Sequence, residues 1–233
     1  MHADQLHALA RATVEGSMPF PEIVGKLNEA ANKIPAAQLK RWGDRFSSPV
    51  LLNRETGNPF VFTREQLISV ALNFGNRGNI DKLLGGYGWN EGAVKAVLDE
   101  NLTAEEWAYV QEVWDTIDGL WPEIEAMEKR LNGVAPERVE AIPVETPYGT
   151  MRGGYFPVVY DPARNYDAAA NAAKNSDLFE NIYTRATTTR GFTKARTEVQ
   201  RPIHLSLGII TRHVAEVVHD LTHREAIINA DKL

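Results

Sequence analysis

AIPVETPYGTMRGGYFPVVYDP, residues 141–162, is the one segment of the chain where strand chemistry replaces helical periodicity. A turn at 147–149 separates two runs with strand character, Ile142–Glu145 and Tyr155–Tyr160. This pattern predicts a β-hairpin at about residues 142–160. A lone hairpin is only marginally stable in water, so we expect this one to pack against the helices that the flanking sequence predicts.

The longest helical pattern runs from Thr103 to Leu131, before the hairpin. Thr103 and Glu106 have the spacing of a capping box. Apolar residues follow at intervals of three and four: Trp107, Val110, Trp114, Ile117, Trp121 and Ile124. Pro122 is expected to kink or restart the helix. Because this spacing is typical of a buried helix face, we favour core packing of the tryptophans over a base-stacking platform.

Further helices are predicted on both sides of these elements. The apolar residues Leu6, Leu9 and Val14 define an N-terminal helix, and Ile23, Val24 and Leu27 define the next. A helix is expected to begin at Pro35, and another after a capping box of Thr63 and Gln66. Two more are expected at 166–183 and 205–231. For residues 47–62 the alternatives are a loop and a short strand pair, Val50–Leu52 with Phe60–Phe62.

The fold class is therefore mainly α, a multi-helix domain with one β-hairpin packed on a long tryptophan-rich helix. No internal repeat or low-complexity tract divides the chain, so residues 1–233 are expected to form one domain. Residues 1–62 are the one stretch that could form a helical subdomain.

The composition is that of an ordinary globular protein, with 43% apolar and 24% charged residues. The absence of cysteine excludes disulfides, thiolate metal sites and a cysteine nucleophile. No apolar run approaches the roughly 20 residues of a membrane span, and the polar N-terminus does not resemble a signal peptide. We therefore expect a cytosolic chain that is not secreted by a signal peptide and has no membrane partner.

Charge is unevenly distributed. Residues 91–145 hold 14 acidic and 4 basic residues, a net charge of −10, against −6 for the whole chain. Residues 184–202 are strongly basic, and Phe192 lies among the cations. We expect these cations to bind an anion or a partner: Arg185, Arg190, Lys194, Arg196 and Arg201. Single-stranded nucleic acid is one candidate ligand. Docking on an acidic protein surface, including residues 91–145, is the alternative that we favour.

The glycine-rich segment 75–90, GNRGNIDKLLGGYGWN, invites comparison with a phosphate-binding loop. It contains neither GxGxxG nor GxxxxGK[ST], and no strand is predicted before it. We favour a tight helix–turn–helix arrangement, with Asn79 as an N-cap and Gly85 at a helix C-terminus.

The predicted C-terminal helix carries the sharpest cluster of titratable residues. His219 and His223 are four residues apart with Asp220 between them, a variant of HExxH with Asp in place of Glu. His213 and Glu216 precede them. A divalent metal bound by His213, His219, Asp220 and His223 would make a metal-dependent hydrolase. A solvated or salt-bridged polar face is the interpretation that we favour.

Five stretches together resemble a region of very large multidomain proteins of tailed phages and prophages, including polyvalent or virion-associated proteins with a PLxRFG motif. They span residues 71–226 and are ALNFGNRGN (71–79), LTAEEWAYVQEVWDTID (102–118), GVAPERVEAIPVETPYGTMRGGYFPVVYDP (133–162), RGFTKARTE (190–198) and HVAEVVHDLTHREA (213–226). The resemblance implies a phage origin and a location in a host cytoplasm or a virion, and it supplies no catalytic residues.

The sequence thus favours a non-catalytic accessory or interaction module of a large virion-associated protein. Another protein is the expected partner, with nucleic acid as a second candidate through residues 184–201, and no cofactor is expected. The metal-dependent hydrolase remains the alternative.

Overall fold

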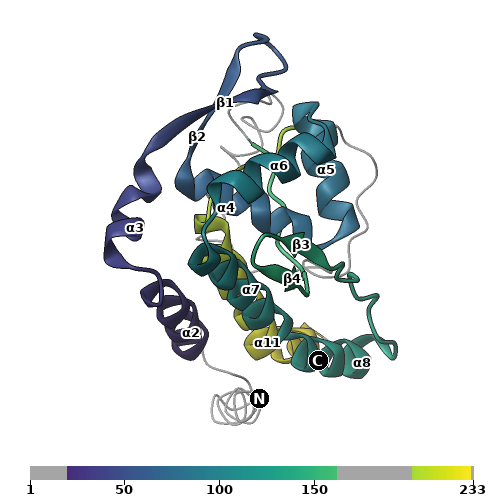
Figure 1. The fold of residues 1–233 in the computed structure, drawn as a ribbon. Coiled ribbons are helices and arrows are strands. Elements are labelled where there is room, and N and C mark those ends of the chain that lie inside the picture. Colours follow the sequence, from purple (N-terminus) through teal and green to yellow (C-terminus); the bar gives the residue numbers. More distant parts are fainter. Residues whose placement is uncertain (1–19, 162–200, 232–233) are drawn as a thin grey trace.

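The computed structural model describes residues 20–161 and 201–231, and these are mainly helical, as predicted (Figure 1). The helices are α2 (Phe20–Asn32), α3 (Ala36–Lys40), α4 (Arg64–Leu72), α5 (Arg77–Tyr87), α6 (Glu91–Asn101), α7 (Ala104–Asp118), α8 (Trp121–Asn132) and α11 (Gly208–Asp231). Two short 3-10 helices are η1 (Arg41–Gly43) and η2 (Asn73–Gly75). The strands are β1 (Arg45–Leu52), β2 (Pro59–Thr63), β3 (Val144–Thr146) and β4 (Gly149–Met151).

Helix α7 forms the centre of the core. Its capping box is confirmed, since the Thr103 side chain accepts from the Glu106 amide and the Glu106 side chain accepts from the Thr103 amide. Trp107 and Trp114 are fully buried, as the apolar spacing predicts. The helix ends at Asp118 and α8 begins at Trp121 with proline in its first turn, so Pro122 restarts the helix, one of the two predicted outcomes.

Helices distant in sequence pack around α7. Helices α2 and α4 both pack against α7, α11 packs against α2 and α8, and Figure 1 shows α4, α5 and α6 above α7. In α11 the apolar residues Ile210, Val214, Val217 and Leu221 are all buried. Ile23 and Leu27 of α2 join the same core. The described part of the predicted N-terminal subdomain therefore shares its core with the rest of the chain.

The strand pair predicted in the 47–62 segment exists, with a different register. β1 and β2 are antiparallel, and Phe62 lies opposite Phe46 rather than opposite Val50–Leu52. The register shifts between Ser48 and Leu52, which indicates a β-bulge. The bulge lets both Ser48 and Leu51 face the core, although they are three residues apart.

The β3–β4 hairpin is shorter than the predicted 142–160. Its strands hold three residues each, and Gly153, with φ +78°, turns the chain inward directly after them. Residues 155–159 run without a strand partner, and Tyr160 pairs with Ile203 in an isolated bridge. The hairpin does pack on α7, as predicted, because the Arg152 amide donates to Gln111 at 2.7 Å.

Helix boundaries in the glycine-rich segment correct the sequence interpretation. Asn76, rather than Asn79, caps α5, and its Oδ1 accepts from the Asn79 amide at 2.9 Å. The helix continues through Gly85 and ends at Gly88, whose φ of +72° is the left-handed conformation common at helix C-termini. The predicted capping box of Thr63 and Gln66 at α4 is confirmed.

Some predictions concern residues outside the described ones. These are the helix with Leu6, Leu9 and Val14, the helix at 166–183, and the basic residues Arg185, Arg190, Lys194 and Arg196.

Candidate functional site

The histidines predicted as metal ligands lie in different environments along α11. His213 is buried, its ring lies 5.6 Å from that of Tyr155, and burial lowers its pKa to about 4. The rings of His219 and His223 stack one turn apart at 4.7 Å. Burial, followed by the neighbouring His223, lowers the pKa of His219.

Asp220 does not complete a metal-ligand set with these histidines. Its carboxylate lies 3.8 Å from the His219 Nδ1. Among the residues that the structure describes, no group of three or more His, Asp or Glu side chains has the arrangement of a metal site. Metal binding by these side chains stays a prediction. It is tested by measuring the metal content of the purified protein.

The C-terminal part of α11 is attached to α8 by ion pairs. Arg224 and Glu128, which are both buried, pair with each other, and Arg130 pairs with Glu225 at 3.2 Å. Because each pair joins two helices, this part of the polar face has a structural role. Of the residues predicted to form a solvated or salt-bridged face, Glu216 pairs with Arg212 at 3.0 Å, whereas His213 is buried.

Of the predicted basic site, Arg201 alone lies within the described residues, and it is exposed. The backbone at Arg201 and Pro202 crosses α5 so closely that a Cβ on Gly86 would collide with it. The backbone position of Arg201 is thus determined by packing, and the structure does not test its binding role.

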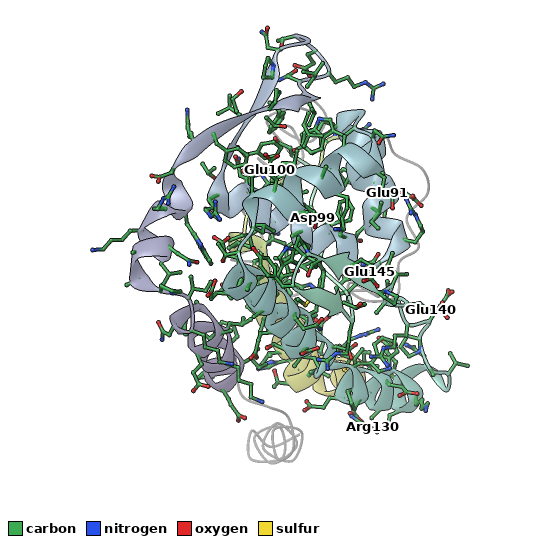
Figure 2. All side chains as sticks on the ribbon, in the orientation of Figure 1. Glu91, Asp99, Glu100, Arg130, Glu140 and Glu145 are labelled. Carbon is green, nitrogen blue, oxygen red and sulfur yellow. The ribbon has the colours of Figure 1, made fainter. Side chains whose placement is uncertain are left out.

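Five of the 14 acidic residues of 91–145 form ion pairs with cations from other described parts of the chain. Lys33, Arg64, Arg77, Arg152 and Arg224 form ion pairs with acids in this region. In Figure 2 the labelled acids, including Glu91, Glu100 and Glu140, are spread over several elements and do not converge on one point.

Two sequence segments, 71–79 and 133–162, meet in the core at a contact that we call the Asn–Gly junction. It consists of Asn73, Gly75, Asn76 and Asn79 from one segment with Gly153, Gly154 and Phe156 from the other. The Asn79 side-chain amide donates to the Phe156 carbonyl at 2.8 Å, and that of Asn76 donates to the Gly154 carbonyl at 3.2 Å. The Gly75 carbonyl accepts from the amides of Ile142 and Gly154.

Glycine is required at this junction because backbones and an indole are in close contact. A Cβ on Gly75 would lie 2.5 Å from the Gly154 carbonyl oxygen and 2.6 Å from the Trp114 ring. A Cβ on Gly154 would lie 2.5 Å from the Trp114 Cβ. All three asparagines of the junction are buried and hydrogen-bonded. The glycine-rich motif therefore builds the core, in agreement with the preference for packing over a phosphate loop.

An exposed apolar surface that the sequence analysis did not single out lies on the β1–β2 hairpin. The described residues expose five large apolar side chains, and three of them belong to this hairpin: Val50 (57% exposed), Leu52 (45%) and Val61 (51%). Leu52 lies opposite Pro59, which is also exposed, so both strands contribute to one face. We call Val50, Leu52, Pro59 and Val61 the outer hairpin face.

The opposite face of the same hairpin is packed into the core. Phe60 and Phe62 contact each other and Trp89, with ring centroids 4.6–5.5 Å apart. The Trp89 indole also donates to the Leu52 carbonyl at 2.9 Å. The outer face is thus presented on a well-anchored hairpin, at the end of the molecule distant from α8 (Figure 1). In the sequence, residues 50–52 and 59–62 are continuous apolar runs, and apolar residues on both faces of a strand pair were the available signal.

No helix of the described residues has the length and apolar character needed to cross a membrane. A comparison with protein-family models finds no match, and comparisons with curated proteins and with solved structures find none either.

Proposed function

We propose that this chain is a non-catalytic interaction module that binds another protein, and that the outer hairpin face is its contact surface. The observation that carries the proposal is the exposure of Val50, Leu52 and Val61 on one side of a hairpin that is firmly packed on its other side. Apolar side chains that gather on one exposed face mark contact sites more often than scattered ones do.

The chemistry of this surface favours a protein over a nucleic acid. Its centre is apolar, and Arg45 lies at one end, two residues before Ser47, which pairs with Val61. Arg45 forms no ion pair among the described residues. The partner is therefore expected to present apolar side chains with a carboxylate beside them. Within the described residues neither β1 nor β2 has a second strand neighbour, so an extended segment could also add to an edge.

The phage-like stretches supply the biological setting of the proposal. The resemblance points to an accessory module of a large virion-associated protein that acts in the host cytoplasm or in the virion. The motifs of residues 71–79 and 133–162 build the Asn–Gly junction, and the outer hairpin face lies in neither of them. We therefore assign the shared motifs to folding and the hairpin to partner contact.

Binding is tested by comparing two sets of substitutions at exposed positions. The test variant carries Val50→Thr, Leu52→Thr and Val61→Thr, since threonine keeps a strand-compatible side chain and removes apolar area. The control is Val134→Thr, at an isolated exposed valine that is 66% exposed. Proteins captured by the wild-type chain from cells that carry its gene are purified, and their affinity is measured against all three chains.

We expect the triple variant to bind at least about tenfold more weakly than the wild type, and the control to bind as the wild type does. Equal affinity of all three chains would overturn the proposed surface. Tight binding of single- or double-stranded DNA that falls steeply with salt, and that is unchanged in the triple variant, would replace the protein partner with a nucleic acid.

A further inference from the structure

A cleft of about 350 Å³ lies where four helices meet, and neither predicted site includes it. Its walls come from α2, η1, the first turn of α4, α7 and the start of α11. The polar and aromatic lining residues are Asn28, Trp42, Glu65, Tyr109 and Thr211, and the apolar ones include Leu27, Ala31, Leu207 and Ile210. This volume is within the range of small-ligand sites, and the mixture of apolar walls and few polar groups is typical of them.

Two aromatic rings form one side of this cleft. The rings of Trp42 and Tyr109 lie 5.4 Å apart at an interplanar angle of 59°. Burial, together with the charge of Glu65, raises the pKa of Tyr109 to about 12, so its hydroxyl is protonated at neutral pH. Such ring faces attract organic cations, with tryptophan the strongest among them.

Glu65 places a carboxylate beside these rings. Its Oε1 accepts from the Leu207 amide at 3.0 Å, just before α11 begins. No donor of the described residues reaches its Oε2, and no cation among them lies within ion-pair distance of the carboxylate. Because most other acids near α7 are paired, Glu65 is an exception in its surroundings.

The Trp42 indole N–H is a second polar group at the cleft, and it lacks a hydrogen-bond partner among the described residues. Its Nε1 is buried and has no hydrogen-bond acceptor. A buried donor without an acceptor costs free energy comparable to that of a lost hydrogen bond. A ligand carbonyl oxygen that reaches this N–H would remove that cost, and because the nitrogen is buried, this contact requires the Trp42 ring to turn toward the cleft.

We propose that the cleft binds an arginine or lysine side chain of a partner protein, with the cation between Glu65 and the aromatic rings and a backbone carbonyl of the partner on the Trp42 indole. The aliphatic stem of such a side chain suits the apolar walls that Leu27 and Leu207 provide. A free alkylamine would satisfy the carboxylate and the rings but not the indole, and this distinguishes a peptide from a small cation. The inference is independent of the outer hairpin face.

The test uses three soluble probes on the full chain. N-acetyl-arginine methylamide carries both the cation and the carbonyl, agmatine carries the cation alone, and N-acetyl-norleucine methylamide carries the carbonyl and the stem alone. Binding is followed through the indole N–H resonances of the five tryptophans, of which the Trp42 signal is assigned by its loss in Trp42→Phe. We expect saturable shifts of the Trp42 signal, with the arginine probe binding most tightly.

Glu65→Gln tests the role of the carboxylate. Glutamine retains an oxygen for the Leu207 amide and removes the charge. We expect this variant to melt as the wild type does and to bind the arginine probe about tenfold more weakly, as the loss of a charge-assisted contact predicts. The control is Glu100→Gln, at an exposed acid of α6, which should bind as the wild type does.

Equal binding of the arginine and norleucine probes, or no difference between wild type and Glu65→Gln, would overturn the proposal and leave Glu65 as a structural contact of α11. Agmatine binding as tightly as the arginine probe would replace the peptide side chain with a free cation.

Discussion

The two β-hairpins of this molecule have opposite relations to its core. β3–β4 and the residues after it bring Gly153 and Gly154 into the interior, where they meet Gly75 and Trp114. β1–β2 buries Phe60 and Phe62 on one face and leaves the other face apolar and exposed. Both hairpins therefore contribute to the core, and β1–β2 in addition leaves an apolar face exposed.

The largest effect is expected from Trp114→Ala, which removes the ring that β4 and its following residues pack against. Trp114 is fully buried, and its Nε1 donates to the Leu72 carbonyl at 3.0 Å. Truncation of a large core side chain costs about 3–5 kcal/mol. Chemical denaturation should show this loss, whereas the triple threonine variant of the outer hairpin face should stay within about 1–2 kcal/mol of wild type. A near-wild-type midpoint for Trp114→Ala would contradict the packing described here.

Gly75→Ala is expected to have the next largest effect. Its Cβ would overlap the Gly154 backbone and the Trp114 ring, and overpacking costs about 1–3 kcal/mol or more. The matched control is Gly78→Ala, three residues later in α5, whose Cβ would meet only the Asn76 Oδ1, at 3.6 Å. This control should be neutral or stabilising by up to about 1 kcal/mol. Thermal unfolding of both variants side by side tests the junction, and equal melting temperatures would refute it.

The contact between Tyr155 and His213 extends the interior hairpin region to α11, and it predicts a pH dependence. The pKa of His213 is about 4 in the fold, below the ordinary value of 6.5. The unfolded chain therefore takes up this proton first as the pH falls. Stability from this group is complete above pH 6.5 and is lost between pH 6.5 and about 4, by up to about 3 kcal/mol. In His213→Leu, stability should fall less steeply over this interval. If the stability of the wild type and of His213→Leu changed equally with pH over this interval, the burial of His213 would be contradicted.

A structural feature could be predicted from the sequence when it depends on residues that are close together in the chain. The capping boxes at Thr63 and Thr103 depend on residues three positions apart, and both were predicted correctly. The cap of α5 was misplaced because Asn76 and Asn79 are both suitable caps. Their assignment is decided by contacts with Gly154 and Phe156, about 78 residues away.

The candidate sites were less predictable for the same reason. The pattern of α11 located the histidines on a helix, but their burial depends on neighbours such as Tyr155, which belongs to another element. The cleft beside Glu65 brings together residues from α2, α7 and α11, so no local pattern could have indicated it. The register of β1–β2, and with it the outer hairpin face, depends on a bulge.

The smallest effect is expected from metal removal, which tests the rival surface on α11. We expect untagged protein to purify without stoichiometric metal and to melt at the same temperature with and without EDTA. Stoichiometric zinc, iron or manganese that is lost in His219→Ala would favour the hydrolase over the interaction module. Elemental analysis of the wild type and this variant gives the answer.

The contrast between the hairpins is tested most directly by site-specific photo-crosslinking in cells that carry the gene. A benzoylphenylalanine is introduced at position 61 of the outer hairpin face, at position 148 in the turn of β3–β4, or at position 134 as the exposed control. The account predicts a discrete crosslinked protein at position 61 and none at positions 134 and 148. Crosslinking of the same protein at positions 134 or 148 but not at 61 would contradict it.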